Sequence, residues 1–145
     1  MIALLQRVSE ARVEVAGVIV ARIGRGLLAF IGVQRDDAAS DAERLAERIL
    51  TYRVFPDAAG RMNLSLRDSA GGLLLVPQFT LAADTRKGTR PSFSAAAEPA
   101  RARLLFDHLV SAAAASHEPV ESGSFAAAMQ VGLVNDGPVT FWLAN

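Results

Sequence analysis

The sequence predicts a single α+β domain that spans residues 1–145 and is built on a mostly antiparallel sheet. A chain of 145 residues has the size of one ordinary domain, and 51% hydrophobic with 21% charged residues is typical of a folded globular chain. Segments with strand character follow one another closely and are separated by tight turns and two amphipathic segments. Sequence neighbours joined by tight turns pair antiparallel, so we expect a sheet curled toward a barrel with both helices outside.

The first third of the chain predicts three strands. Polar and apolar residues alternate over residues 11–15, Gly17 follows, and residues 18–20 are apolar, which together indicate a hairpin. A second turn at residues 24–26 precedes a continuous apolar run over residues 27–33. A run of this length without alternation predicts a strand buried on both faces.

The middle of the chain predicts a helix and two further strands. Residues 40–43 match a capping box, and apolar residues then recur at helical spacing, namely Leu45, Ile49 and Tyr52. Turn-forming residues over 55–60 end this helix. Residues 63–66 then indicate a short strand, and residues 73–76 a third buried strand.

A polar loop and a second helix follow. Periodicity disappears over residues 82–97, where the stretch 84–91 holds three basic residues and one acidic residue. Long loops in compact domains often carry function. Pro99 suits the first position of a helix, whose apolar residues are Leu105, Phe106, Leu109 and Val110.

The C-terminal segment predicts a hairpin with an unusual turn. Strands over residues 129–134 and 139–143 are joined by residues 135–138, and the Asp-Gly pair within that turn is a strong hairpin signal. Pro138 removes a backbone donor where strand pairing should resume, and X-Pro bonds adopt the cis form at low cost. Either Pro138 lies on an edge strand after a simple turn, or the turn has a functional role.

Composition narrows the chemistry. The chain has no cysteine and only His108 and His117, which removes thiol nucleophiles, disulfides and the usual zinc-ligand sets. A formal net charge of zero disfavours a protein that coats duplex nucleic acid and eases association into oligomers. No membrane-length apolar run and no secretory signal are recognisable, so we expect a cytoplasmic protein without metal, cofactor or membrane partner.

The usual catalytic side chains are poorly placed. Both histidines lie on or just after the second predicted helix, whereas a Ser–His–Asp triad needs a histidine that reaches the nucleophile. Asp36, Asp37 and Asp41 precede or begin the first helix, where acidic residues favour the positive end of the helix dipole.

The end of the third buried strand is a better candidate for a site. There the chain passes from Pro77 into Gln78, Phe79 and Thr80 and then opens into the basic loop. The alternative is purely structural: the proline ends the strand, the phenylalanine fills the core and the threonine caps a turn.

Several segments taken together resemble the D-aminoacyl-tRNA deacylase family, whose enzymes remove D-amino acids from mischarged tRNA. Residues 78–82 resemble the family's Ser-Gln-Phe-Thr signature, and residues 135–140 resemble its Gly-cis-Pro motif. The resemblance extends over nearly the whole chain, with further similar segments at residues 1–8, 60–64, 90–94 and 140–143. Pro77 departs from the family, which usually has serine there, and supplies neither a hydroxyl nor an N–H group.

The resemblance implies a homodimer in which Gly137 and Pro138 of each subunit enter the active site of the other. Their carbonyls would hold the α-amino group of the substrate and leave no room for an L side chain, while Arg7 would support the turn. Selectivity would then arise from exclusion by a rigid backbone.

For catalysis, we expect Gln78, Phe79 and Thr80 to form the centre, with backbone N–H groups of the last two binding the oxyanion. The neighbouring ribose hydroxyl or a positioned water then attacks the ester. A Thr80 nucleophile stays open, although no histidine or assured carboxylate lies beside it to act as base.

The tRNA end is expected at Phe79, Met129 and the loop residues Arg86, Lys87 and Arg90, with adenine against apolar side chains and phosphates near the cations. The alternatives are that Met129 is a core residue and that the loop with Arg86, Lys87 and Arg90 is an ordinary solvated loop. The predicted activity is hydrolysis of D-aminoacyl-tRNA with rejection of the L form, and glycyl-tRNA is a further candidate substrate. A non-catalytic dimer that binds a small ligand or a tRNA end at the intersubunit cleft, and an esterase using Thr80, are the alternative functions.

Overall fold

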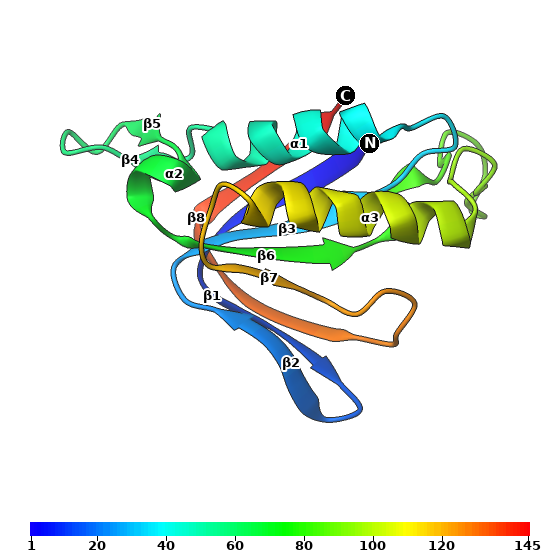
Figure 1. Cartoon of the computed structure of the whole chain (residues 1–145), viewed down its shortest axis with the longest axis horizontal. Helices are drawn as coiled ribbons and strands as arrows, with labels where there is room; N and C mark the ends of the chain where they lie inside the picture. Colours follow the sequence, from blue (N-terminus) through cyan, green and yellow to red (C-terminus); the bar gives the residue numbers. More distant parts are fainter.

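The computed structural model describes residues 1–145 (Figure 1), and its 14-residue strand β1 pairs with three other strands of the main sheet. On one edge β1 pairs antiparallel with β2 and β3 in succession, and on the other with β8. The six strands of this sheet are β1 (Ile2–Val15), β2 (Val18–Ile23), β3 (Gly26–Gly32), β6 (Gly72–Pro77), β7 (Val120–Ser122) and β8 (Gln130–Ala144).

The sheet is mixed: the pairings of β1 with β2, β3 and β8 are antiparallel, as expected for most of the sheet, but the sequence did not predict its two parallel pairings. β3 pairs parallel with β6, and β6 pairs parallel with β7. Parallel neighbours need a long crossover. Between β3 and β6 the chain passes through helix α1 (Ala39–Thr51), the small hairpin β4 (Phe55–Pro56) and β5 (Met62–Leu64), and helix α2 (Leu66–Ser69). The predicted strand over 63–66 therefore ends early, and a short helix begins at Leu66.

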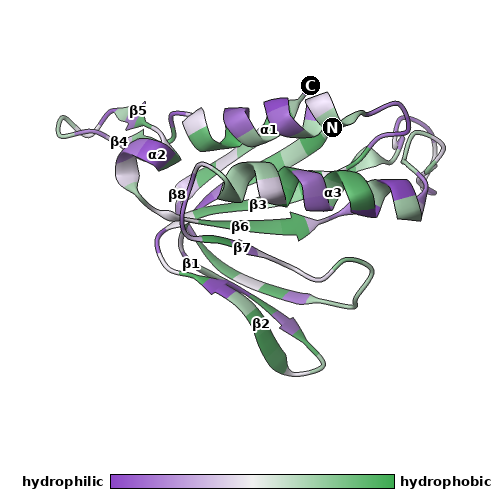
Figure 2. Ribbon diagram, viewed as in Figure 1, coloured by the Kyte–Doolittle hydropathy of each residue, from purple (hydrophilic) through white to green (hydrophobic).

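The two predicted amphipathic helices, α1 and α3 (Pro99–Ala114), pack on the same face of the sheet. Alternate residues of β3 face opposite sides of the sheet. Leu27, Ala29 and Ile31 belong to the core beneath the helices, whereas Leu28 belongs to a second core on the opposite face. Figure 2 shows hydrophobic colour along the central strands and banded colour on both helices. The second core is enclosed because β2 and the first half of β8 curl over it, which gives the barrel-like shape.

The start of α1 differs from the predicted capping box. Ala38 is the N-cap, and the Asp41 carboxylate accepts a hydrogen bond of 2.9 Å from the Ala38 N–H group. Asp41 therefore satisfies a free amide at the helix start, the role that the sequence had suggested for the first-turn acids. No helix is both long and apolar enough to cross a membrane.

The C-terminal hairpin prediction is wrong, because β8 is one strand of 15 residues that pairs with β1 along most of its length. In the ladder, Gln6 pairs with Thr140 and Val8 pairs with Asn135. Between these two pairs the chain advances two residues along β1 but five residues along β8. The three additional residues bulge out of the ladder at residues 136–138. Asp-Gly-Pro therefore forms a bulge inside one strand rather than a turn between two.

Candidate active site

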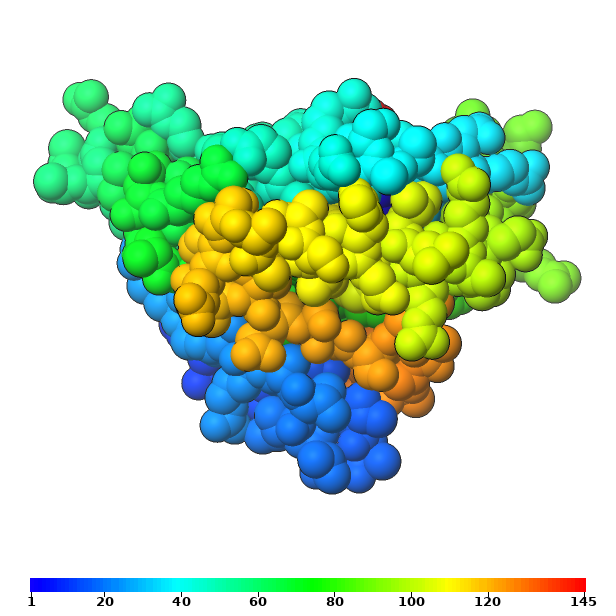
Figure 3. Space-filling view, in the orientation of Figure 1, coloured from blue at the N-terminus to red at the C-terminus, as the bar shows by residue number.

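A cavity of about 500 Å³ lies where β6 ends, between the N-terminal half of α3 and the segment before β8. In Figure 3 this segment (orange) lies directly beneath α3 (yellow). The lining is mostly apolar and consists of Ile31, Val33, Val76, Pro77, Gln78, Phe79, Ala97, Pro99, Ala102, Phe106, Phe125, Ala126, Ala127, Met129 and Val131. Three predicted site residues, Gln78, Phe79 and Met129, therefore meet in one cavity.

The local sequence explains how this cavity is shaped. The Gln78 N–H group donates to the Ile31 carbonyl at 2.7 Å, which completes the edge of β6, and the 3₁₀ turn η1 (Phe79–Ala82) follows. A Cβ on Gly32 would lie 2.9 Å from the Leu81 Cβ atom, so glycine is required where η1 packs on β3. Pro77 closes the ladder, as the structural alternative predicted.

The polar groups at this strand end are uncharged. The Gln78 side-chain amide donates to the Thr80 hydroxyl at 2.5 Å. The first intrahelical bond of η1 runs from Leu81 N–H to the Gln78 carbonyl, which leaves the N–H groups of Phe79 and Thr80 without an intrahelical acceptor. Of these two residues, Phe79 lines the cavity and Thr80 does not.

The cavity lining contains no ionisable side chain. His108 pairs with Glu43 at 2.9 Å, linking α3 to α1, and the His117 ring nitrogen lies 2.7 Å from the Gly71 carbonyl. Neither histidine serves Thr80. The side-chain hydrogen bond of Thr80 is with Gln78, and no histidine or carboxylate pairs with its hydroxyl as a base would.

The bulge that contains Gly137 and Pro138 is held by Arg7. The guanidinium Nε donates to the Asp136 carbonyl at 2.8 Å, and Nη1 donates to the Val54 carbonyl at 2.6 Å. The peptide bond between Gly137 and Pro138 is cis. Residues 136–138 are exposed, whereas the Arg7 side chain is only 13% exposed. Arg7 therefore contacts the bulge, and the role in selectivity that the resemblance implies for it stays a prediction.

The bulge and the cavity lie at opposite ends of β3 within one chain. Arg7 pairs with Leu27 near the start of β3, whereas Pro77 pairs with Ile31 near its end. The position of Leu27 and that of Ile31 are four residues apart along β3, or about 13 Å at ~3.3 Å per residue. The Gly137–Pro138 pair and the Gln78–Thr80 segment therefore do not form one site in a single subunit.

The basic loop is closed at its base by a backbone pair. Asp84 and Ser92 exchange hydrogen bonds of 2.8 and 3.0 Å, and the Arg86 guanidinium donates to both Asp84 carboxylate oxygens. These bonds lower the pKa of Asp84 to about 2. Arg86 is exposed but paired with Asp84, so Lys87 and Arg90 are the exposed cations of the loop that make no ion pair.

Sequence reasoning missed two aromatic residues of this region. Phe125 lines the cavity and lies 6.3 Å, centroid to centroid, from Phe106, which was predicted only as a helix core residue. Phe93 packs against Phe79 with ring centroids 5.1 Å apart. No signal in the sequence singles out either residue: Phe93 follows a polar loop, and Phe125 lies in a stretch with no periodicity.

Comparison with known proteins identifies the family. A family profile described as D-Tyr-tRNA(Tyr) deacylase matches residues 4–144. A D-aminoacyl-tRNA deacylase of Alkalilimnicola ehrlichii is 70% identical over 99% of this chain and 95% of its own length. The chain belongs to the D-aminoacyl-tRNA deacylase family. A deacylase of Thioalkalivibrio sulfidiphilus is 69% identical over 99% of this chain and 96% of its own length, and one of Methylococcus capsulatus is 60% identical over 99% and 94%.

Two solved structures share the deacylase-family fold. A protein titled c-Myc DNA Unwinding Element Binding Protein matches with a TM-score of 0.95 and 34% identity, covering 100% of this chain and 99% of its own. A probable eukaryotic D-amino acid tRNA deacylase matches with a TM-score of 0.85 over 98% and 97% of the two chains, at 17% identity, which supports the fold alone. The family resemblance inferred from the sequence is therefore confirmed.

Proposed function

We propose that this chain hydrolyses the ester bond of D-aminoacyl-tRNA, releasing the D-amino acid and tRNA, and that it rejects the L form. Family membership supports the reaction, and the apolar cavity at the end of β6 supports this strand end as its proposed location. The apolar walls suit the terminal adenosine, with Phe79 and Met129 against the base. The ester then lies beside Thr80 at the polar edge of the cavity.

Catalysis in this proposal uses backbone groups of the enzyme and a hydroxyl of the substrate. The N–H groups of Phe79 and Thr80 stabilise the oxyanion that forms when the ester carbonyl is attacked. The attacking oxygen is a neighbouring ribose hydroxyl or a water that it positions. Gln78 already donates to the Thr80 hydroxyl, an arrangement that fixes the threonine and adds no basicity to it.

Stereochemical selection in this proposal comes from a second copy of the chain. Because the bulge lies about 13 Å along β3 from the level of the cavity, it reaches an active site only in a homodimer, where Gly137 and Pro138 of one subunit face the cavity of the other. The bulge is exposed and held in shape by Arg7. A fixed backbone surface there admits a hydrogen atom and excludes an L side chain, which is discrimination by steric conflict.

The deciding experiment incubates the protein with D-tyrosyl-tRNA and, separately, with L-tyrosyl-tRNA. Selective release of D-tyrosine is expected. Release of both amino acids would indicate a general esterase, and release of neither would indicate a binding protein. Glycyl-tRNA belongs in the same assay, because glycine has no side chain for the bulge to exclude and should be accepted.

The role of Thr80 is tested by Thr80→Ala, for which we expect at least a tenth of the wild-type rate constant. A loss of four or more orders of magnitude would establish threonine as the nucleophile, since removing a catalytic nucleophile has effects of that size. Thr80→Ser is the matched control, because it retains the hydroxyl that Gln78 contacts. Cytoplasmic location and the absence of a cofactor stay predictions.

A further inference from the structure

Two phenylalanine rings form an exposed pair at the rim of the cavity. Phe79 is 59% exposed and Phe93 is 41% exposed, and their rings are tilted by 49° with centroids 5.1 Å apart. Phe79 lines the cavity whereas Phe93 does not. The pair therefore extends an aromatic surface from the cavity outward onto the face of the molecule.

The backbone holds Phe93 in this position. Its neighbour Ser92 is paired with Asp84 at the base of the basic loop, and the Ala96 N–H group donates to the Phe93 carbonyl at 3.0 Å. Gln34 and Ala96 form a further bridge that ties this segment to the chain after β3. Phe93 is thus attached to an ordered scaffold, so little conformational freedom is lost when a ligand packs on it.

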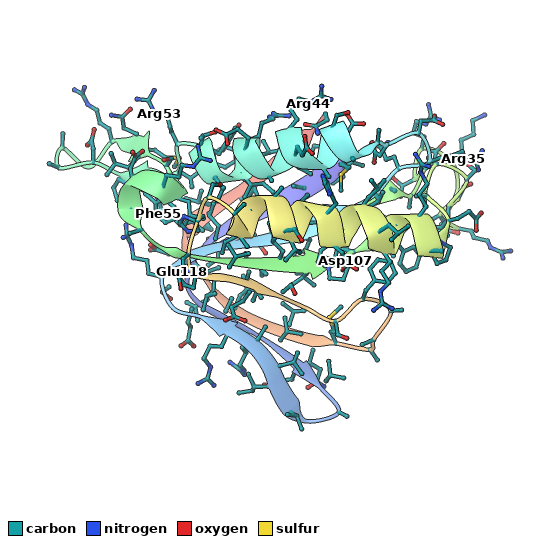
Figure 4. The ribbon with its side chains drawn as sticks, in the orientation of Figure 1. Arg35, Arg44, Arg53, Phe55, Asp107 and Glu118 are labelled. Carbon is teal, nitrogen blue, oxygen red and sulfur yellow. The ribbon has the colours of Figure 1, made fainter.

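Exposed cations lie on the loop that leads to Phe93. Lys87 and Arg90 are exposed on the adjoining loop and make no ion pair, and Arg35 lies at the same end of the molecule (Figure 4). Exposed aromatic faces beside cations that are free of acidic partners suit single-stranded nucleic acid, whose bases stack on rings while its phosphates meet the cations.

We propose that the Phe79–Phe93 pair stacks on the base of the nucleotide that precedes the terminal adenosine of the tRNA, with Lys87 and Arg90 near its phosphates. The inference rests on the proposed function, since it needs the terminal adenosine in the cavity. Phe79 belongs to both sites and sets the path of the strand between them. Phe93 is a binding residue of this second site and has no part in the cavity itself.

The test measures binding of a fluorescent RNA hairpin with a single-stranded CCA end, compared with the same hairpin carrying an abasic nucleotide second from the 3′ end. The wild-type protein should bind the intact hairpin at least about fivefold more tightly, the lower end of the effect of one base–aromatic stack. Phe93→Ala and Phe93→Leu should both lose this difference. Leu104→Ala is the control, because Leu104 is 72% exposed and lies outside the cavity lining.

The cation positions give a separate readout. Lys87→Ala should weaken binding of both hairpins equally and reduce the salt dependence of binding by about 0.7 in log–log slope for each phosphate that the protein no longer neutralises. If Phe93→Ala binds the intact hairpin as tightly as the wild type, the inference is overturned. It is also overturned if Phe93→Ala converts a dimer into a monomer in sedimentation, since the rings would then be a subunit contact.

This assay separates the inference from the proposed function because it needs no hydrolysis. A Phe93-dependent preference for the intact hairpin in a protein that releases no D-amino acid would support the stacking site and contradict the activity. D-selective hydrolysis with no effect of Phe93 on either hairpin would support the activity and overturn the stacking site.

Discussion

Arg7 offers the sharpest test of how the bulge is held. The substitution Arg7→Met keeps the aliphatic stem and removes both hydrogen bonds, the one to the Val54 carbonyl at 2.6 Å and the one to the Asp136 carbonyl at 2.8 Å. The bond to Val54 is partly buried, so its loss costs about 1.5–3 kcal/mol, the range for a charged donor. Water can replace the donor at exposed Asp136, which limits that loss to about 0.5–1 kcal/mol.

These two contributions predict that Arg7→Met lowers the free energy of unfolding by about 2–4 kcal/mol. The Asp136 carboxylate contributes little, because it lies 3.6 Å from Arg7 and is 52% exposed, and exposed ion pairs are worth under about 1 kcal/mol. Asp136→Asn is therefore the matched control. It keeps the backbone carbonyl that Arg7 contacts and removes only the charge.

Urea unfolding followed by circular dichroism measures the free energy of unfolding of both variants, at several protein concentrations because the proposed dimer would stabilise the folded state. The same variants are assayed with D- and L-tyrosyl-tRNA, and Arg7→Met should narrow the D-to-L rate ratio. An Asp136→Asn variant as unstable as Arg7→Met would refute the reasoning. So would an Arg7→Met variant whose free energy of unfolding lies within about 0.5 kcal/mol of the wild type, a threshold set by typical surface substitutions.

Three further predictions follow from the site. Gly137→Ala should lower the free energy of unfolding by about 1–3 kcal/mol. Gly137 has a φ of +147°, and a Cβ there would lie 2.6 Å from a Val139 methyl group. Gly24→Ala is the control and should be close to neutral in the same unfolding experiment, because nothing lies within 4 Å of its Cβ. The Asp84 carboxylate should titrate near pH 2 in carbon NMR, so its ion pair with Arg86 is complete above about pH 4 and is lost as the pH falls through 2. Arg86→Ala should return the pKa of Asp84 toward 3.8. Dialysis against EDTA should leave unchanged the rate at which D-tyrosine is released from a D-tyrosylated RNA hairpin, because no carboxylate, imidazole or thiolate lines the cavity. Loss of this activity that is restored by a metal would contradict the proposed chemistry.

Local patterns predicted the elements whose structure depends on local forces. The period of Leu45 and Ile49 located α1, Pro99 located the start of α3, and the apolar run over 27–33 located β3. Parallel pairing of β3 with β6 was missed, because it joins residues more than 40 positions apart and nothing within either strand specifies the partner. The direction of a strand in its sheet is set by tertiary packing, which composition and periodicity do not report.

The error at the C-terminal segment has a specific physical origin. Asp136 and Gly137 carry the signal of a hairpin turn, yet β1 is long enough to pair with both halves of β8. Pairing with an existing strand recovers more backbone hydrogen bonds than a self-paired hairpin, so the turn residues are expelled as a bulge. The site residues were found through resemblance, whereas Phe93 and Phe125 required the fold, because only the fold brings them against Phe79 and Phe106.

The long pairing of β1 with three other strands also restricts where the chain can change in length. A one-residue insertion between Arg7 and Ala11 would turn every later side chain of the strand to the opposite face, taking Val13 out of the inner core and moving the bulge away from the guanidinium that holds it. The loop over residues 85–91, in contrast, is closed at its base and makes no pairing beyond it. Length can therefore vary in the loop that we propose to meet the RNA backbone, whereas β1, which carries Arg7, keeps a fixed count of residues.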